Sequence, residues 1–99
     1  FNMASIKDIV TGKKPVLIDF YETWCGTCQT MMPILEQVKD QLGDAAKIIK
    51  IDVDKNQSLA SKYQVRGVPT LMIFKEGKPV WRLSCVVLAN ELVSLIQSH

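Results

Sequence analysis

The stretch Trp24-Cys25-Gly26-Thr27-Cys28 places two thiols three positions apart, about one turn of a helix. At this spacing one thiol can attack a disulfide, and the other can then close an intramolecular disulfide that releases the product. This chemistry is thiol–disulfide exchange, which proceeds through a mixed disulfide. The motif therefore predicts a redox centre, and the flanking sequence provides the test of that prediction.

A structural disulfide and half of a zinc site are the alternatives for this pair. Structural zinc sites need four ligands, and outside the motif the chain offers only Cys85 and His99. A total of three cysteines does not suit a disulfide-stapled scaffold, which uses a larger and even set. We therefore expect a redox pair, with neither a metal nor a bound cofactor.

Length and charge exclude several other classes of protein. The 99 residues suffice for one domain with a modest core, so we expect a single domain over residues 1–99. The net charge of +2 and the scattered lysines argue against binding to nucleic acid or to a membrane surface. No membrane-length apolar run and no export signal is visible, which favours a cytoplasmic protein. Phe1-Asn2, ahead of Met3, resembles a cloning remnant and is left out of the fold prediction.

The hydrophobic pattern predicts strands that alternate with helices and a hairpin near the end. Strands are expected at residues 16–21, 47–53, 70–74 and 80–85, with a turn at Glu76-Gly77. Helices are expected at residues 5–10, at residues 28–42, after an Asp54-x-x-Gln57 capping box, and around Leu88, Leu92, Leu95 and Ile96. This order predicts an α/β fold with a mixed sheet covered on both faces.

The two cysteines differ in position and therefore in expected role. The motif lies where the strand at residues 16–21 ends and a helix begins, the edge at which α/β folds bind ligands. Cys25 is then at the helix N-terminus, where free N–H groups and the positive end of the helix dipole favour a thiolate. Cys28 lies one turn further in, more buried, and stays a thiol. We expect Cys25 to attack and Cys28 to resolve.

Asp19 is the unusual residue of the first strand, an acid among apolar neighbours, six positions before Cys25. A buried carboxylate without partners is costly and tends to take up a proton. Asp19 is therefore a candidate to handle the proton of Cys28, the alternative being a strand-end acid that faces solvent. Lys50 on the next strand is either its charge partner or an exposed lysine.

Two further residues near the motif have open interpretations. Pro69 precedes a strand, and general frequencies favour a trans bond after Val68. Trp24 either shields the thiols or packs like any other tryptophan.

In its ordered motifs the chain resembles the thioredoxin family over nearly its whole length. The resemblance rests on residues 16–21, the Trp-Cys-Gly-x-Cys motif, Pro33 in the following helix, and residues 50–54, 63–70 and 74–77. It implies a thioredoxin fold, with a central mixed sheet of about four strands flanked by four helices. The short N-terminal segment implies that the family's first edge strand is short or missing.

The resemblance also assigns roles. It implies that Cys25 is the nucleophile, Cys28 the resolving thiol, Asp19 a buried proton relay and Lys50 its partner. In the family Pro69 is cis, and the backbone of the preceding residue, here Val68, pairs with the bound substrate peptide. Trp24, Gly26 and Thr27 would border the same substrate.

The implied function is the reduction of protein disulfides by a monomer that receives electrons from an NADPH-dependent thioredoxin reductase. Two alternatives stay open. One is a disulfide isomerase or oxidase of the same fold, and the other is a non-catalytic binding module that uses the groove at Val68-Pro69.

Three positions depart from the family pattern. Thr27 stands where proline is usual, and Gln29 where lysine is common. Cys85 stands where glycine is usual, beside the substrate groove. Cys85 is either a small half-buried hydrophobe of the last strand or a thiol that narrows the groove and links two molecules on oxidation.

Overall fold

A computed structural model describes residues 2–99, and Phe1 lies outside the described residues. Four strands form one sheet in the order β2-β1-β3-β4. They are β1 (Val16–Tyr21), β2 (Lys47–Asp52), β3 (Thr70–Lys75) and β4 (Lys78–Leu83). β1 runs parallel to β2 and antiparallel to β3, and β4 pairs antiparallel with β3. The predicted mixed sheet of four strands is confirmed.

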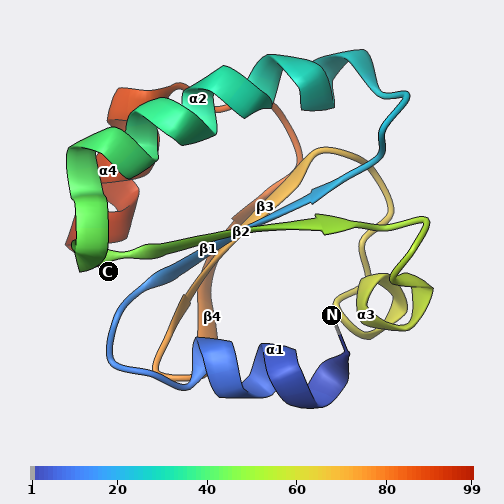
Figure 1. The fold of residues 1–99 in the computed structure, drawn as a ribbon, viewed down its shortest axis with the longest axis horizontal. Coiled ribbons are helices and arrows are strands. Elements are labelled where there is room, and N and C mark those ends of the chain that lie inside the picture. Colours follow the sequence, from blue (N-terminus) through green and yellow to red (C-terminus); the bar gives the residue numbers. More distant parts are fainter. Residues whose placement is uncertain (1) are drawn as a thin grey trace.

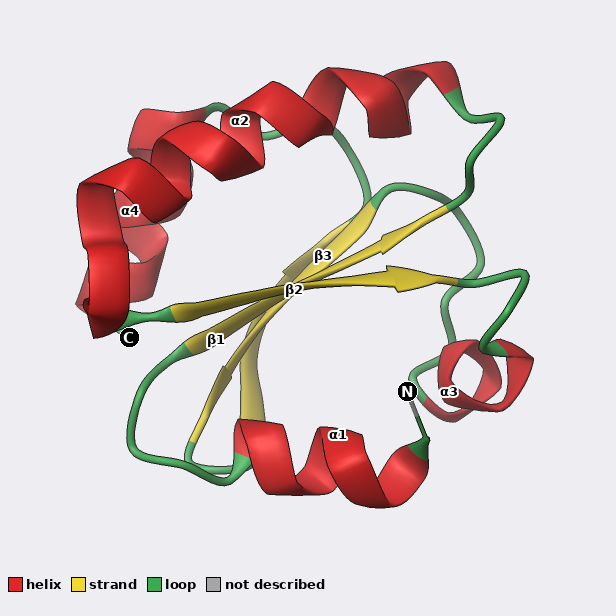
Figure 2. Ribbon diagram, in the orientation of Figure 1, coloured by secondary structure: helices red, strands yellow, loops and turns green. Residues whose placement is uncertain are grey.

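Four helices cover this sheet, namely α1 (Met3–Val10), α2 (Gly26–Leu42), α3 (Gln57–Lys62) and α4 (Ala89–Ser98). Helices α2 and α4 lie over one face, and α1 and α3 lie on the other (Figures 1 and 2). Within residues 2–99, no helix combines the length and the apolar character needed to span a membrane.

Each face of the sheet has its own apolar core because successive residues of a strand point to opposite faces. Leu17 of β1 packs in the cluster on the α2 and α4 side, whereas Ile18 and Phe20 pack in the cluster on the α1 and α3 side. The first five residues of β1 are all buried, which explains their continuously apolar pattern apart from Asp19.

The last strand lies two residues earlier than predicted. Lys78–Leu83 forms β4 at the edge of the sheet, the position at which a proline such as Pro79 is tolerated within a strand. After Leu83 the chain leaves the sheet, and the Ser84 hydroxyl lies 2.9 Å from the Thr70 hydroxyl. Cys85 therefore follows the strand and is exposed, so its prediction as a half-buried residue of the last strand is wrong.

The start of α1 also corrects a prediction. The Asn2 side chain accepts a hydrogen bond from the Ser5 N–H at 2.9 Å, and the Ser5 hydroxyl accepts one from the Asn2 N–H at 3.1 Å. This reciprocal pair is a capping box, and α1 accordingly begins at Met3. Leaving Asn2 out of the fold was wrong, since it caps the first helix.

The capping box predicted at Asp54-x-x-Gln57 is not formed. The N-cap of α3 is Asn56, which makes no side-chain capping bond. A different carboxylate organises this loop, because Asp52 Oδ1 accepts hydrogen bonds from the N–H groups of Asp54 at 2.9 Å and Lys55 at 3.4 Å.

Two predicted chain reversals are confirmed and use left-handed backbone. Gly43 ends α2 with φ 52°, and its N–H donates to the Lys39 carbonyl. Glu76 and Gly77, with φ values of 52° and 84°, connect β3 to β4 as a tight hairpin.

Candidate active site

Cys25 is the N-cap residue of α2, at the end of the loop that follows β1. Its Sγ accepts a hydrogen bond from the backbone N–H of Cys28 at 3.2 Å, as a serine or aspartate oxygen does at most N-caps. The hydroxyl of Thr27 lies 3.2 Å from the same sulfur. Hydrogen bonding with Cys28 and then with Thr27 lowers the pKa of the Cys25 thiol. The position therefore favours a thiolate.

Cys28 has the opposite environment. Its side chain is fully buried in the first turn of α2, and this burial raises the pKa of its thiol to about 12. The two pKa values are thus shifted in opposite directions, so Cys25 ionises at a lower pH than Cys28. This difference supports the predicted order, in which Cys25 attacks and Cys28 follows.

Asp19 is fully buried in the middle of β1. Neither carboxylate oxygen has a hydrogen-bond partner among the described residues. Burial raises the pKa of Asp19 to about 7, against an opposing effect of the Lys50 charge. The charge of Asp19 is also one of the causes that raise the pKa of Cys28, so the two groups influence each other. A solvent-facing Asp19 is excluded.

Lys50 lies directly across from Asp19 in the register of β2 against β1. Its side chain is exposed, and it makes no hydrogen bond to the Asp19 carboxylate. Lys50 therefore acts on Asp19 only through the longer-range attraction of its charge.

The Val68–Pro69 peptide bond is cis, as the family resemblance implied. The Val68 carbonyl oxygen accepts a hydrogen bond from the Cys25 thiol at 3.7 Å. This contact brings the segment before β3 against the N-terminus of α2, so the backbone of Val68 and the sulfur of Cys25 border the same space.

A hollow of about 370 Å³, which we call the Cys25 hollow, opens beside this contact. Three segments line it, contributing Glu22, Trp24, Cys25, Val53, Val65, Arg66, Gly67 and Val68. Trp24 is 75% exposed at this surface, so it is not a core residue. Gly26 and Thr27 are exposed next to the sulfur, and a side chain at Gly26 would meet only open space.

Comparison with known proteins decides the family. The thioredoxin family model matches residues 2–98 of the chain. The chain belongs to the thioredoxin family. A thioredoxin variant from Halobacterium salinarum superposes with a TM-score of 0.90 at 41% identity, over 98% of this chain and 84% of that one.

Two of the curated relatives show the range of lengths. The chain is 50% identical over 87 residues to the chloroplastic thioredoxin Y of rice, Oryza sativa, which covers 88% of this chain and 52% of the rice protein. It is 46% identical over 95 residues to a thioredoxin-like protein of the cyanobacterium Synechocystis, which covers 95% and 90% of the two chains. The chain thus spans about half the length of the rice thioredoxin.

Cys85 follows Ser84, whose hydroxyl lies 2.9 Å from that of Thr70 next to Pro69. Its thiol is free and exposed, just beyond β4. It is not among the residues that line the Cys25 hollow. That Cys85 narrows the substrate groove stays a prediction, and its exposure makes it available to a second molecule.

Two residues of the site were not singled out from the sequence. Glu22 lies in the Cys25 hollow, and its Oε2 is buried without a hydrogen-bond partner among the described residues. Arg82 of β4 donates to the backbone carbonyls of Tyr63 and Gln64, the second at 2.7 Å. It thereby anchors the segment that leads to the hollow. Only the position of Glu22, two residues before the Trp24–Cys28 motif, could have indicated its role in the sequence.

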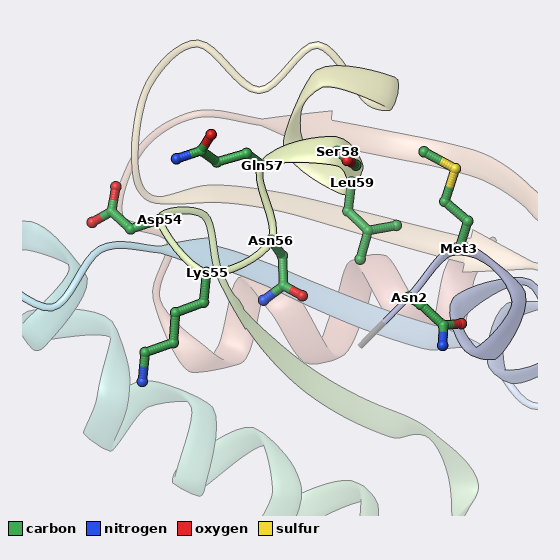
Figure 3. A pocket seen from close by; sticks show the side chains of 8 residues that line it. All are labelled: Asn2, Met3, Asp54, Lys55, Asn56, Gln57, Ser58 and Leu59. Carbon is green, nitrogen blue, oxygen red and sulfur yellow. The ribbon is translucent and has the colours of Figure 1, made fainter.

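A second hollow, of about 560 Å³, lies between the start of α1 and the loop into α3 (Figure 3). Amide, hydroxyl and charged side chains line much of it, and it contains no cysteine. The loop already satisfies part of its own polar groups, because the Asn56 amide donates to the Asp52 carbonyl at 2.9 Å. This hollow therefore offers no redox chemistry.

Proposed function

We propose that this chain is a thiol–disulfide oxidoreductase that reduces protein disulfides. The observation that carries the proposal is the contrast between the two thiols. Cys25 caps α2 with a hydrogen-bonded sulfur of lowered pKa, and Cys28 is buried with a raised pKa. Membership of the thioredoxin family supports the same activity.

In the first step the substrate lies across the exposed surface of Trp24, Gly26 and Thr27, with its backbone paired to Val68 beside Pro69. The Cys25 thiolate attacks one sulfur of the substrate disulfide. A Cys25–substrate S–S bond forms as the substrate S–S bond breaks, and the second substrate sulfur leaves as a thiolate that takes up a proton.

In the second step Cys28 loses its proton and attacks Cys25 Sγ. The Cys25–Cys28 disulfide forms, the mixed disulfide breaks, and the remaining substrate sulfur leaves as a thiolate. Two electrons have then passed from the protein to the substrate. Asp19 is the proposed acceptor of the Cys28 proton, since its pKa is raised to about 7 and both its oxygens lack partners. Lys50 tunes Asp19 through its charge.

The oxidised pair needs an external reductant. We propose an NADPH-dependent thioredoxin reductase and a reducing cytoplasm, where free thiols persist. Relatives named as chloroplastic thioredoxins make a ferredoxin-dependent reductase the competing donor. Turnover with each purified donor system distinguishes the two.

A second candidate, disulfide isomerisation or oxidation, is favoured by the Thr27 contact. A hydrogen bond that stabilises the Cys25 thiolate also stabilises the reduced protein, and this makes the disulfide a stronger oxidant. Equilibration with a defined glutathione buffer decides between the candidates, because the reduction potential sets the direction of net transfer.

A trapping experiment tests the mechanism. In a Cys85→Ser background, Cys28→Ser should accumulate a mixed disulfide with a protein substrate through Cys25, and Cys25→Ser should form none. Cys25→Ser should also abolish reduction of a protein disulfide with dithiothreitol as the electron source. A Cys25→Ser protein that keeps its full biological activity would instead favour a non-catalytic binding module.

A further inference from the structure

Glu22 is the carboxylate of the Cys25 hollow that has no partner. It follows β1, its side chain is half-buried, and it lines the hollow together with Trp24 and Cys25. Its Oε2 is buried and accepts no hydrogen bond from any described residue. A carboxylate that is half-buried and lacks a donor within the protein is incompletely compensated, so a cation that pairs with its accessible part would gain more than at a fully exposed carboxylate.

Two other acids, Asp54 and Asp52, influence Glu22. Burial, then the charge of Asp54, then that of Asp52 raise the pKa of Glu22, so the neighbouring acids make its surroundings unfavourable for a further negative charge. Asp52 Oδ1 is already occupied by the N–H groups of Asp54 and Lys55. Glu22 thus lies close enough to two other acids for their charges to raise its pKa, and this grouping of carboxylates favours a cation over an anion nearby.

Arg66 is the one basic residue that lines the same hollow. Its side chain is exposed, and it does not satisfy the buried oxygen of Glu22. Arg66 therefore does not neutralise Glu22 through an internal ion pair. Because Arg66 is exposed and Glu22 is half-buried, salt screens the charge of Arg66 more strongly than that of Glu22.

We propose that Glu22 is a specificity residue that selects disulfides flanked by an arginine or lysine side chain, whose cation enters the Cys25 hollow. The inference rests on the proposed disulfide reductase activity and names its substrate class. The cation would pair with the Glu22 carboxylate where that side chain borders the hollow, and would lie against the exposed ring of Trp24, which attracts positive charge through its π-face. Both residues line the same hollow as Cys25, so the cation and the disulfide would bind together.

Three peptides test the proposal. They share one intramolecular disulfide and differ only in an arginine, glutamine or glutamate next to the attacked cysteine. All proteins carry Cys85→Ser, and the readout is the ratio of kcat/KM between peptides, which cancels any change in overall activity. Wild-type protein should prefer the arginine peptide over the glutamine peptide by about fivefold at low salt, less at high salt.

The variants assign the preference to one side chain. Glu22→Gln should bring the ratio close to one, and Glu22→Lys should favour the glutamate peptide. Glu36→Gln, which removes an exposed carboxylate of α2, is the matched control and should keep the wild-type ratio. Arg66→Gln should keep or increase the preference for arginine.

The proposal is refuted if wild-type protein reduces the three peptides at equal rates, or if Glu22→Gln keeps the arginine preference. A separate measurement, reduction of the small neutral bis(2-hydroxyethyl) disulfide by wild-type protein, tests the reductase activity itself. Failure there would overturn the proposed function, whereas success there with no charge preference would overturn only the role of Glu22.

Discussion

The Sγ of Cys25 and the carbonyl oxygen of Val68 lie 3.7 Å apart, although 43 positions separate them in the sequence. The thiol can donate to this carbonyl only while it is protonated. After ionisation the sulfur keeps the N–H of Cys28 as a donor, and the carbonyl is free to accept from a substrate backbone. The same atom of Val68 is thus released when the nucleophile forms.

Alkylation of the reduced protein should report the two thiol environments. In a Cys85→Ser background we expect iodoacetamide to modify Cys25 first near neutral pH, because the pKa of Cys25 is lowered and that of Cys28 is raised to about 12. Reaction at Cys25 should persist below the ordinary thiol pKa of about 8.5. Peptide mass spectrometry identifies the site, and preferential labelling of Cys28 would reverse the assigned roles.

Asp19→Asn should stabilise the reduced protein in a pH-dependent manner. The pKa of Asp19 is raised from 3.8 to about 7 by burial, so the folded protein holds a proton that the unfolded chain releases. Wild-type stability therefore falls as pH rises from about 4 to about 7, by about 4 kcal/mol at most, since one pKa unit corresponds to about 1.4 kcal/mol. The asparagine variant has no carboxylate at this position, so its stability should not fall with pH for this reason.

Urea unfolding at about pH 4.5 and about pH 8 measures this effect, with the gain expected mainly at the higher pH. An equal gain at both values would show that packing rather than charge is responsible. The same variant should slow turnover of a disulfide substrate, because asparagine cannot accept the Cys28 proton. Unchanged turnover between about pH 6 and about pH 9 would remove Asp19 from the mechanism.

Thr27→Val and Thr27→Pro should both make the protein more reducing. Each removes the hydroxyl that lies 3.2 Å from Cys25 Sγ, so the pKa of Cys25 should rise toward that of a free thiol. Loss of one hydrogen bond of about 1 kcal/mol corresponds to about 20 mV for this two-electron couple. Equilibration with glutathione measures the shift, and an unchanged or less negative potential in the valine variant would show that the contact has no such effect.

Arg82→Met should loosen the segment that precedes the cis peptide bond. The guanidinium donates to the carbonyls of Tyr63 and Gln64, and Gln64 has a left-handed φ of 54°. We expect a loss of about 1 kcal/mol in the free energy of unfolding and faster amide exchange at residues 64–68. Arg66→Met, an equal change of charge in the same segment, is the control. Equal effects of both substitutions would trace the loss to charge.

Mild oxidation should produce a disulfide-linked dimer through Cys85. Cys25 and Cys28 close their own disulfide, whereas Cys85 is exposed and has only intermolecular partners. A non-reducing gel should show the dimer for wild-type protein and none for Cys85→Ser. A dimer that persists in Cys85→Ser would show that another cysteine forms the intermolecular disulfide. A purely monomeric wild-type protein would show that Cys85 does not link two molecules.

Much of the fold follows from patterns that are local in the sequence. The continuous apolar run of β1 predicted a strand buried on both faces, and therefore also the burial of Asp19. The position of the motif between that strand and α2 predicted Cys25 at the helix terminus. These features could be predicted because a period of two or of 3.6 residues determines which side chains face a core.

The features that were missed depend on partners distant in the chain. Arg82 donates to backbone carbonyl oxygens 18 and 19 positions away. Because every residue has a backbone carbonyl, the sequence does not indicate which residues accept these hydrogen bonds. The offset of β4 arose because an edge strand accepts Pro79, and whether a strand is at an edge is a property of the whole sheet. Asn2 was left out of the fold prediction because of its place ahead of Met3, although asparagine is a favoured N-cap residue.

The sulfur that closes the first turn of α2 is also the sulfur that changes oxidation state. A thiolate is a charged acceptor for the Cys28 N–H, whereas a disulfide sulfur is a neutral and weak one. Electron transfer and the local order of this turn are therefore linked in one thermodynamic cycle. Consider a substitution at the start of α2 that alters neither thiol. If it stabilises the first turn more in the reduced protein than in the oxidised protein, the free energy of reduction changes by that difference.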